Sequence, residues 1–184
     1  MTKVLIFFLF GIFVSCSTSN VTLNENGKIG EGKIENSLKI GKWKFRKNGK
    51  LNSIGNYSKG LKNGKWNYFY TNGKIHQRGI FINDNQNGIW KYYFESGEFM
   101  GEGKLIDDKQ DGLWKWYQKN GSLYTERLYQ NGKLIEIKSC FNKNGEALDC
   151  GKIINGNGNL IFHDLENESN PIQNFNYENG MIKK

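Results

Sequence analysis

The sequence predicts an all-β protein made of stacked antiparallel β-hairpins behind a short apolar leader. Tryptophan follows glycine by two residues at Trp43, Trp66, Trp90 and Trp114, so these positions are 23, 24 and 24 residues apart. The chain also has 23 glycines but one proline, and 14% of its residues are aromatic, which favours short strands and tight turns over helices. A fixed period of this length is typical of stacked supersecondary units.

The N-terminus predicts a lipoprotein signal peptide over residues 1–15. Its uncharged apolar run, residues 4–14, is too short for a helix that crosses a bilayer, since such a helix needs about 20 residues. The run ends just before Cys16, and this arrangement resembles the signal of bacterial lipoproteins, whose cysteine becomes the acylated first residue. An ordinary cleaved signal with an incidental cysteine is the alternative. We expect Cys16 to be acylated and residues 16–25 to form a flexible tether.

A turn dipeptide follows each repeated tryptophan and closes a hairpin. Asn-Gly between apolar runs is the strongest short signal for a two-residue type I′ turn, because both turn residues need positive φ. The dipeptides are Asn48-Gly49, Asn72-Gly73, Ser96-Gly97 and Asn120-Gly121. We expect a repeat domain over 26–184, with degenerate units at both ends and full repeats near 41–63, 64–87, 88–111 and 112–134.

Two-residue turns also predict which residues face each other across each hairpin. They place Trp90 opposite Gly103, and we expect the indole to lie across this glycine and cover its bare backbone. Arg127 takes the place of the glycine opposite Trp114, where we expect its guanidinium to stack on the indole.

The other face of the sheet supports the same register. Because side chains alternate between faces, this register pairs Lys91 with Glu102 and Lys115 with Glu126, and opposite charges at such positions contribute roughly 0.2–1 kcal/mol each. The same face carries the candidate binding residues: Phe69, Tyr93 and Tyr117, opposite His76, Met100 and Tyr124. Aromatic rows of this kind can stack sugar rings or receive a peptide. Packing of these side chains against one another is the alternative.

The pattern G-x-W-x-x-[YF]-x-x-[NS]-G, followed by G-x-[YFL] and closed by [ND]-G, resembles the bacterial variant of the MORN repeat. The resemblance covers nearly the whole chain after the leader. It implies an elongated, twisted antiparallel sheet with two strands per repeat. It also implies interaction rather than catalysis, because eukaryotic relatives act as scaffolds and membrane-apposition modules. Some members carry the label of antitoxin component, a role for which an exported protein is badly placed.

We predict neither an enzyme nor a cofactor, since the sequence contains no catalytic motif. The two histidines, His76 and His163, belong to no Cys/His cluster with metal-ligand spacing. Asp107, Asp108 and Asp111 fit a solvated turn better than a calcium site, because their spacing matches no calcium-binding loop.

The sequence leaves a disulfide between Cys140 and Cys150 open. An exported protein meets an oxidising compartment, which permits the bond. A two-residue turn at Asn144-Gly145, however, pairs Cys140 with Asp149 and puts the two cysteines on opposite faces. A bulge or a longer turn is needed to join them.

The charge balance favours a lysine-rich solvated surface over a nucleic-acid site. The net charge is +8, but only Arg46, Arg78 and Arg127 of the 26 basic residues are arginine, and no nucleic-acid motif is present. We expect the partner to be another envelope protein or another copy of the chain, with carbohydrate or cell-wall binding as the alternative. The membrane would be reached through the lipid anchor. No acidic residue directly follows Cys16, so we expect the outer membrane, facing the periplasm.

Overall fold

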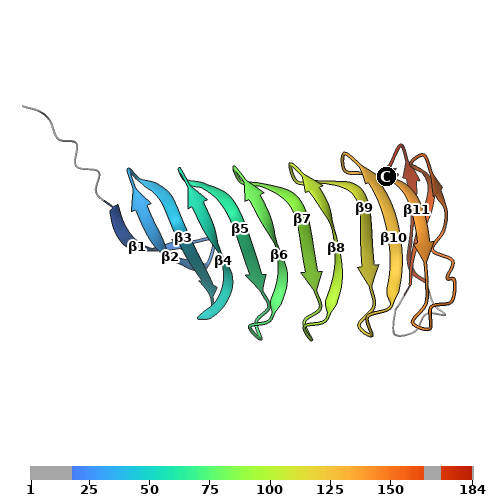
Figure 1. Ribbon diagram of the computed structural model, residues 1–184, viewed down its shortest axis with the longest axis horizontal. Coiled ribbons are helices and arrows are strands. Elements are labelled where there is room, and N and C mark those ends of the chain that lie inside the picture. The colour runs from blue at the N-terminus through green and yellow to red at the C-terminus, as the bar shows by residue number, and fades with distance from the viewer. Residues whose placement is uncertain (1–17, 164–170, 184) are drawn as a thin grey trace, which may run out of the picture.

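A computed structural model describes residues 18–163 and 171–183, which form strands and turns without a helix in these ranges. Eleven strands make one antiparallel sheet in which each strand pairs with its neighbours in the sequence, so the strands follow one another along the long axis of the molecule (Figure 1). The strands are β1 (Thr18–Glu25), β2 (Lys28–Glu35), β3 (Leu38–Lys47), β4 (Lys50–Ser58), β5 (Leu61–Phe69), β6 (Ile75–Ile82), β7 (Asn85–Tyr93), β8 (Phe99–Ile106), β9 (Lys109–Tyr117), β10 (Leu123–Gln130) and β11 (Lys133–Cys140).

The C-terminal part forms a second sheet. The sequence had predicted a single elongated sheet. The four strands of the second sheet are β12 (Ile153–Ile154), β13 (Asn157–His163), β14 (Pro171–Glu178) and β15 (Met181–Ile182). It packs beside the last strands of the long sheet, where Leu134, Ile153 and Leu160 form a buried cluster (Figure 1). Leu134 N–H donates to the Gly180 carbonyl at 3.0 Å. The second sheet therefore caps this end of the repeat array, as terminal units of repeat proteins must do.

The predicted flexible tether is wrong for residues 18–25, because they form β1. This strand pairs with β2 along its whole length, from Thr18 opposite Glu35 to Glu25 opposite Lys28. Val21 and Leu23 alternate with polar residues and pack against the tryptophan cluster. Such alternation is the usual signal of a half-buried strand. Residues 1–15 and Cys16 lie outside the described residues.

Two kinds of turn connect the strands. The turn at Asn48-Gly49 has two residues, both with positive φ (50° and 75°), as predicted for type I′. The next three repeats have three-residue loops instead, and in the first of these Tyr70 N–H donates to the Lys74 carbonyl while Gly73 N–H donates to the Tyr70 carbonyl. An asparagine before the glycine is thus compatible with a two-residue turn and with a three-residue loop. The 24-residue repeats have one residue more than the 23-residue repeat, and they form the three-residue loop.

A bulge beyond each three-residue loop restores the predicted pairing in the middle of the hairpin. On β8, Met100 is the extra residue, since Tyr93 pairs with Phe99 whereas Tyr92 pairs with Gly101. Trp90 consequently lies opposite Gly103, as predicted. The two predicted ion pairs are also present, because Lys91 Nζ lies 3.0 Å from Glu102 Oε2 and Lys115 Nζ lies 3.0 Å from Glu126 Oε1.

The predicted direction of the indoles is wrong, because each repeat tryptophan covers a glycine of the preceding hairpin. A Cβ added to Gly79 would lie 2.3 Å from Cδ2 of Trp90, and one added to Gly103 would lie 2.0 Å from Cδ2 of Trp114. The first two repeat tryptophans do the same: Trp43 covers Gly32 and Trp66 covers Gly55. The four indoles are between 0% and 2% exposed.

The hydrogen bond of the indole explains this direction. Trp90 Nε1 donates to the carbonyl of Ile80 on the preceding hairpin, at 3.2 Å. A buried indole N–H requires an acceptor, and the other three repeat tryptophans use the equivalent carbonyls at 3.1 to 3.2 Å. The bulge at Gly88, whose φ is 72°, shifts the register between β6 and β7 beside this bond. At each junction the indole and its hydrogen bond to the preceding hairpin thus add to the backbone pairing between neighbouring strands, such as that of β6 with β7.

Candidate interaction surfaces

The outer face of the long sheet, opposite the buried tryptophans, carries a row of large apolar side chains. We call it the outer row, and its members are Phe69, Ile75, Tyr93, Phe99, Tyr117 and Leu123. They are cross-strand pairs on six consecutive strands, β5 to β10, and all are half-buried. The sequence placed Phe69, Tyr93 and Tyr117 on this face, and the structure keeps them there.

The predicted partners of these three residues do not join the row. His76, Met100 and Tyr124 are the bulge residues of their hairpins, so no residue pairs with them across the hairpin. Their side chains have other surroundings, since the His76 ring lies 4.6 Å from the Tyr70 ring, and Tyr124 is buried with the cysteines. The error arose from the assumed two-residue turns. The repeat length is the signal that could have prevented this error. Among the four full repeats, only the 23-residue unit has a two-residue turn after its tryptophan strand, whereas the 24-residue units have three-residue loops.

The rings of the outer row meet at angles rather than in one plane. Tyr93 and Phe99 have centroids 5.8 Å apart and an interplanar angle of 69°, and Phe99 and Tyr117 are 5.3 Å apart at 43°. The guanidinium of Arg78 lies 5.3 Å from the centre of the Tyr93 ring, and Lys91 Nζ lies 5.8 Å from that of Phe99. Cations thus cover part of two rings.

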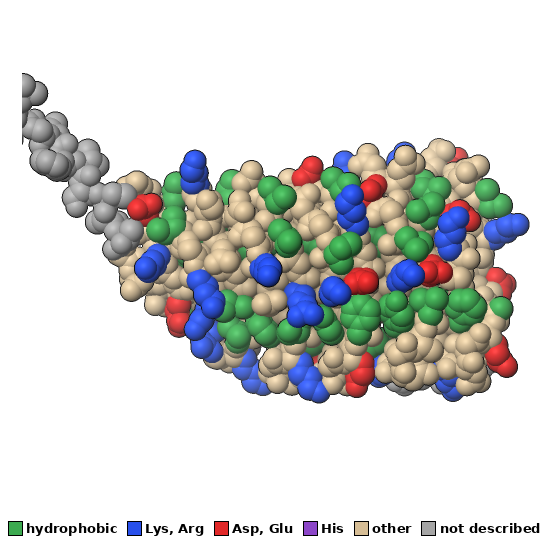
Figure 2. Space-filling model, in the orientation of Figure 1, with side chains coloured by type: hydrophobic (Ala, Val, Ile, Leu, Met, Phe, Trp, Pro, Cys, Tyr) green, Lys and Arg blue, Asp and Glu red, His purple; other side chains and the backbone are tan. Residues whose placement is uncertain are grey.

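Charged residues border the outer row on the same face. The ion pairs Lys91–Glu102 and Lys115–Glu126 alternate in sign across four neighbouring strands. Figure 2 shows a row of alternating positive and negative side chains above a continuous band of hydrophobic ones. A band of apolar side chains with a charged rim is the usual anatomy of a protein interface.

The tryptophan face is packed rather than open in its N-terminal half. Lys62 Nζ lies 5.0 Å from the centre of the Trp66 ring and 3.3 Å from the Tyr68 hydroxyl, and burial lowers the pKa of this lysine. Burial also raises the pKa of Tyr68 to about 12. A cavity of about 220 Å³ remains between these side chains and Phe45, Ser53 and Tyr57.

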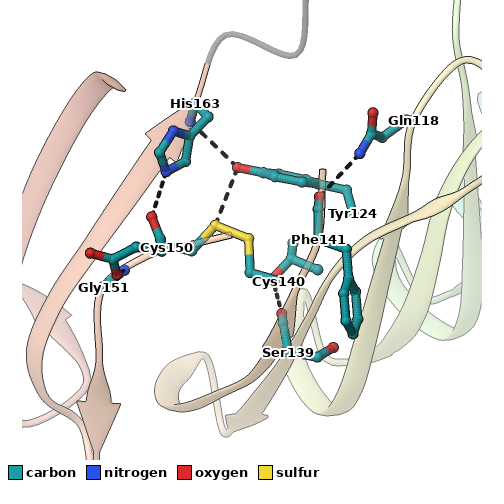
Figure 3. The surroundings of a disulfide bond; sticks show 10 residues. Gln118, Tyr124, Ser139, Cys140, Phe141, Cys150, Gly151 and His163 are labelled. Carbon is teal, nitrogen blue, oxygen red and sulfur yellow. Dashed lines mark hydrogen bonds between the residues drawn. A yellow bond between two sulfur atoms is a disulfide. The ribbon is translucent and has the colours of Figure 1, made fainter. Parts of the chain in front are cut away.

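Cys140 and Cys150 form a disulfide, with Cα atoms 6.1 Å apart, at the junction of the two sheets (Figure 3). The loop between them has the longer turn that this bond requires, because Asn142 N–H donates to the Glu146 carbonyl. The Tyr124 hydroxyl lies 3.8 Å from Cys150 Sγ, which places this tyrosine beside the bond (Figure 3). The bond thus holds the capping segment against the last repeat.

No group of three or more His, Cys, Asp or Glu side chains is placed to hold a metal ion in the part of the chain that the structure describes. Asp107 and Asp108 form a two-residue turn with positive φ, and Asp108 accepts a hydrogen bond from Gln86 N–H at 2.7 Å. They are therefore turn residues in the structure. Within the described residues, no helix is long and apolar enough to span a bilayer.

Comparison with known families agrees with the fold. A model of the MORN repeat variant matches residues 62–83 and 110–131, which run from the start of β5 to the turn after β6 and from β9 to the turn after β10. Two of its hairpins, β5–β6 and β9–β10, therefore match the MORN repeat variant. A MORN repeat here is one hairpin with its tryptophan turned onto the hairpin before it. MORN repeats are generally modules for protein or membrane interaction and are typically not catalytic. No curated protein matches the chain.

Proposed function

We propose that the chain is a lipid-anchored, non-catalytic scaffold of the bacterial envelope, which binds another envelope protein through the outer row. The outer row carries the proposal, because six half-buried apolar side chains on adjacent strands are more than a single-layer sheet needs on its solvent side. Contiguous exposed apolar patches on soluble domains usually mark interaction sites. Self-association through the same row is the alternative partner.

Cys16 is the proposed site of acylation, and the outer membrane, facing the periplasm, is the proposed location. The apolar run before Cys16 and the lack of an acidic residue directly after it support this. β1 begins at Thr18, two residues after the cysteine. Two residues span at most about 7 Å, so the anchor would hold the first strand close to the bilayer surface.

Fractionation of cells tests the anchor. The Cys16→Ala variant should leave the detergent-extracted membrane fraction, because the domain itself has no other proposed means of membrane attachment. A matched Cys140→Ala variant should remain with the membranes. Equal membrane partitioning of the Cys16→Ala variant and the parent would reject acylation at this residue.

Crosslinking in whole cells, followed by pull-down, tests the interaction surface. The double variant Tyr93→Ser/Phe99→Ser removes the centre of the outer row and should lose the crosslinked partner. Ile89→Ser is a matched control, because Ile89 is 52% exposed on the same face of β7 but lies outside the row. Retention of the partner by the double variant would show that the outer row does not carry the interaction.

Carbohydrate or cell-wall binding is the second candidate, since Tyr93, Phe99 and Tyr117 present half-exposed rings. The angle of 69° between the first two rings argues against it, because flat sugar rings stack best on rings that share a plane. Sedimentation with purified peptidoglycan separates the two functions. Pelleting of the parent, but not of the Tyr93→Ser/Phe99→Ser variant, would establish cell-wall binding in place of protein binding.

A further inference from the structure

Arg127 interrupts the series of glycines that are covered by the indole of the next hairpin. It lies opposite Trp114, in the place that Gly103 holds opposite Trp90 in the preceding repeat. Gly103 is covered by Trp114, the tryptophan of the next hairpin. Arg127 has no such tryptophan beside it, because the residue that pairs with it on β11 is Ile137. With no further indole to accommodate, this position has room for a long side chain.

The guanidinium of Arg127 lies against the capping sheet rather than against an indole. Its central carbon is 4.7 Å from the centre of the Phe162 ring on β13. The predicted stacking on Trp114 is therefore replaced by stacking on Phe162. An aromatic ring under one face of a guanidinium holds its plane and leaves its N–H edge free for an acceptor.

This guanidinium is buried without a carboxylate partner among the described residues. Arg127 is 6% exposed, and its Nε has no hydrogen-bond acceptor within residues 18–163 and 171–183. The ion pairs between described residues involve lysines only. A buried charged donor without an acceptor is costly, and residues of this kind are usually paired. The described part of the chain therefore supplies no anionic acceptor to this guanidinium.

A cavity of about 280 Å³ lies beside the guanidinium. Among the described residues around the cavity, Arg127 is the one that carries a charge, and the other side chains are aromatic or thioether: Phe94, Met100, Trp116, Tyr117, Tyr124, Tyr129 and Phe162. Pockets for small ligands have this composition, with apolar walls and a few polar groups that fix the orientation of the ligand. Met100 adds an adaptable wall, because its side chain is unbranched.

We propose that this cavity binds a small organic carboxylate with an aromatic or branched apolar body. The carboxylate accepts two parallel hydrogen bonds from the guanidinium edge of Arg127, the geometry in which arginine prefers to bind this group. The apolar body lies between Trp116, Tyr124 and Met100. The cavity lies where the two sheets meet and adjoins one end of the outer row, because Tyr117 borders both, but Arg127 and the other residues around it lie outside that row.

Calorimetric titration of the full chain in non-ionic detergent tests this site, with empty micelles as the reference. The probe is 3-phenylpropanoate, and 3-phenylpropan-1-ol is its neutral counterpart of similar shape. The acid should bind at least tenfold more tightly than the alcohol. Arg127→Met keeps most of the side-chain volume and should abolish this preference, whereas Arg78→Met, which removes an exposed arginine beside the Tyr93 ring, should leave it unchanged.

Met100→Trp provides an independent variant that keeps the arginine. The larger side chain should fill the cavity and reduce the affinity for the acid at least tenfold, even if Arg127→Met fails to fold. Near-ultraviolet circular dichroism checks the fold of each variant. Equal binding of the acid and the alcohol, no binding of the acid at 10 mM, or full affinity in folded Met100→Trp would each overturn the proposal, and Arg127 would then be a packing residue of the cap.

Discussion

The coupling between Trp90 and Gly79 is the sharpest test of how the hairpins are joined. A Cβ at position 79 would lie 2.3 Å from Cδ2 and Cε2 of Trp90, closer than non-bonded carbons can approach. In Gly79→Ala the indole must move, which costs roughly 1–3 kcal/mol for overpacking. The hydrogen bond from Trp90 Nε1 to the Ile80 carbonyl is then also lost, for about 1 kcal/mol more. We expect Gly79→Ala to destabilise by about 2–4 kcal/mol.

The double variant should cost much less than the sum of the two single changes. Trp90→Ala alone should destabilise by about 3–5 kcal/mol, because it removes a fully buried indole. Once the indole is absent, the methyl group added at position 79 meets open space and its penalty disappears. The coupling energy should therefore equal the cost of Gly79→Ala, about 2–4 kcal/mol, at the upper end for residues in contact. Urea denaturation, followed by far-ultraviolet circular dichroism, measures all four free energies of unfolding.

Gly103 is the matched control for this cycle. It lies directly opposite Trp90 in the strand register, but its bare backbone is covered by Trp114. Gly103→Ala should therefore couple strongly to Trp114→Ala and weakly to Trp90→Ala. A stronger coupling of Trp90 to Gly103 than to Gly79 would refute the assignment of each indole to the preceding hairpin.

Three further predictions follow from the described contacts. Reduction of Cys140–Cys150, which are 10 residues apart, should lower the free energy of unfolding by about 3 kcal/mol in the chain-entropy model, as seen in urea melts with and without reductant. Exchange of Lys91 and Glu102 should change stability by less than about 1 kcal/mol, because both side chains are partly exposed; a larger loss in the same melts would contradict this. The pKa of Tyr68 is raised by burial from 10.0 to about 12, so its contribution to stability is complete below pH 10 and is lost as the pH rises towards 12. Tyr68→Phe should consequently raise the midpoint of alkaline unfolding, and an unchanged midpoint would exclude this tyrosine as a cause.

The repeat period and the turn dipeptides were enough to predict the long sheet and the pairing in the middle of its hairpins. The side-chain directions were not predictable in the same way. Which glycine Trp90 covers depends on the acceptor of its N–H, and that carbonyl belongs to another hairpin. The bulge at Met100 likewise cancels the extra loop residue, so a wrong turn and a missing bulge together gave the correct register for Trp90.

The candidate surfaces were predictable only where they follow strand alternation. Tyr93 and Tyr117 could be placed on the outer face because each follows a charged residue of the same face by two positions. The cavity beside Arg127 could not be found, since Phe162 reaches it from a second sheet with no repeat pattern. The departure from glycine at position 127 was the one sequence signal for this cavity.

The placement of each indole on the preceding hairpin gives the array an order in time. As the chain emerges N-terminus first, a hairpin has its own ladder of backbone bonds but still lacks a cover for its glycine. That cover arrives with the next repeat, 24 residues later in most of the array. A chain that stops after β8 would lack Trp114, and the backbone of Gly103 would remain uncovered. A chain that begins at β5 would keep Gly79 and Gly103 covered and would lack only Gly55, the glycine on which Trp66 lies. Shortening from the two ends should therefore have different consequences, and the fold is completed only when the capping sheet has emerged.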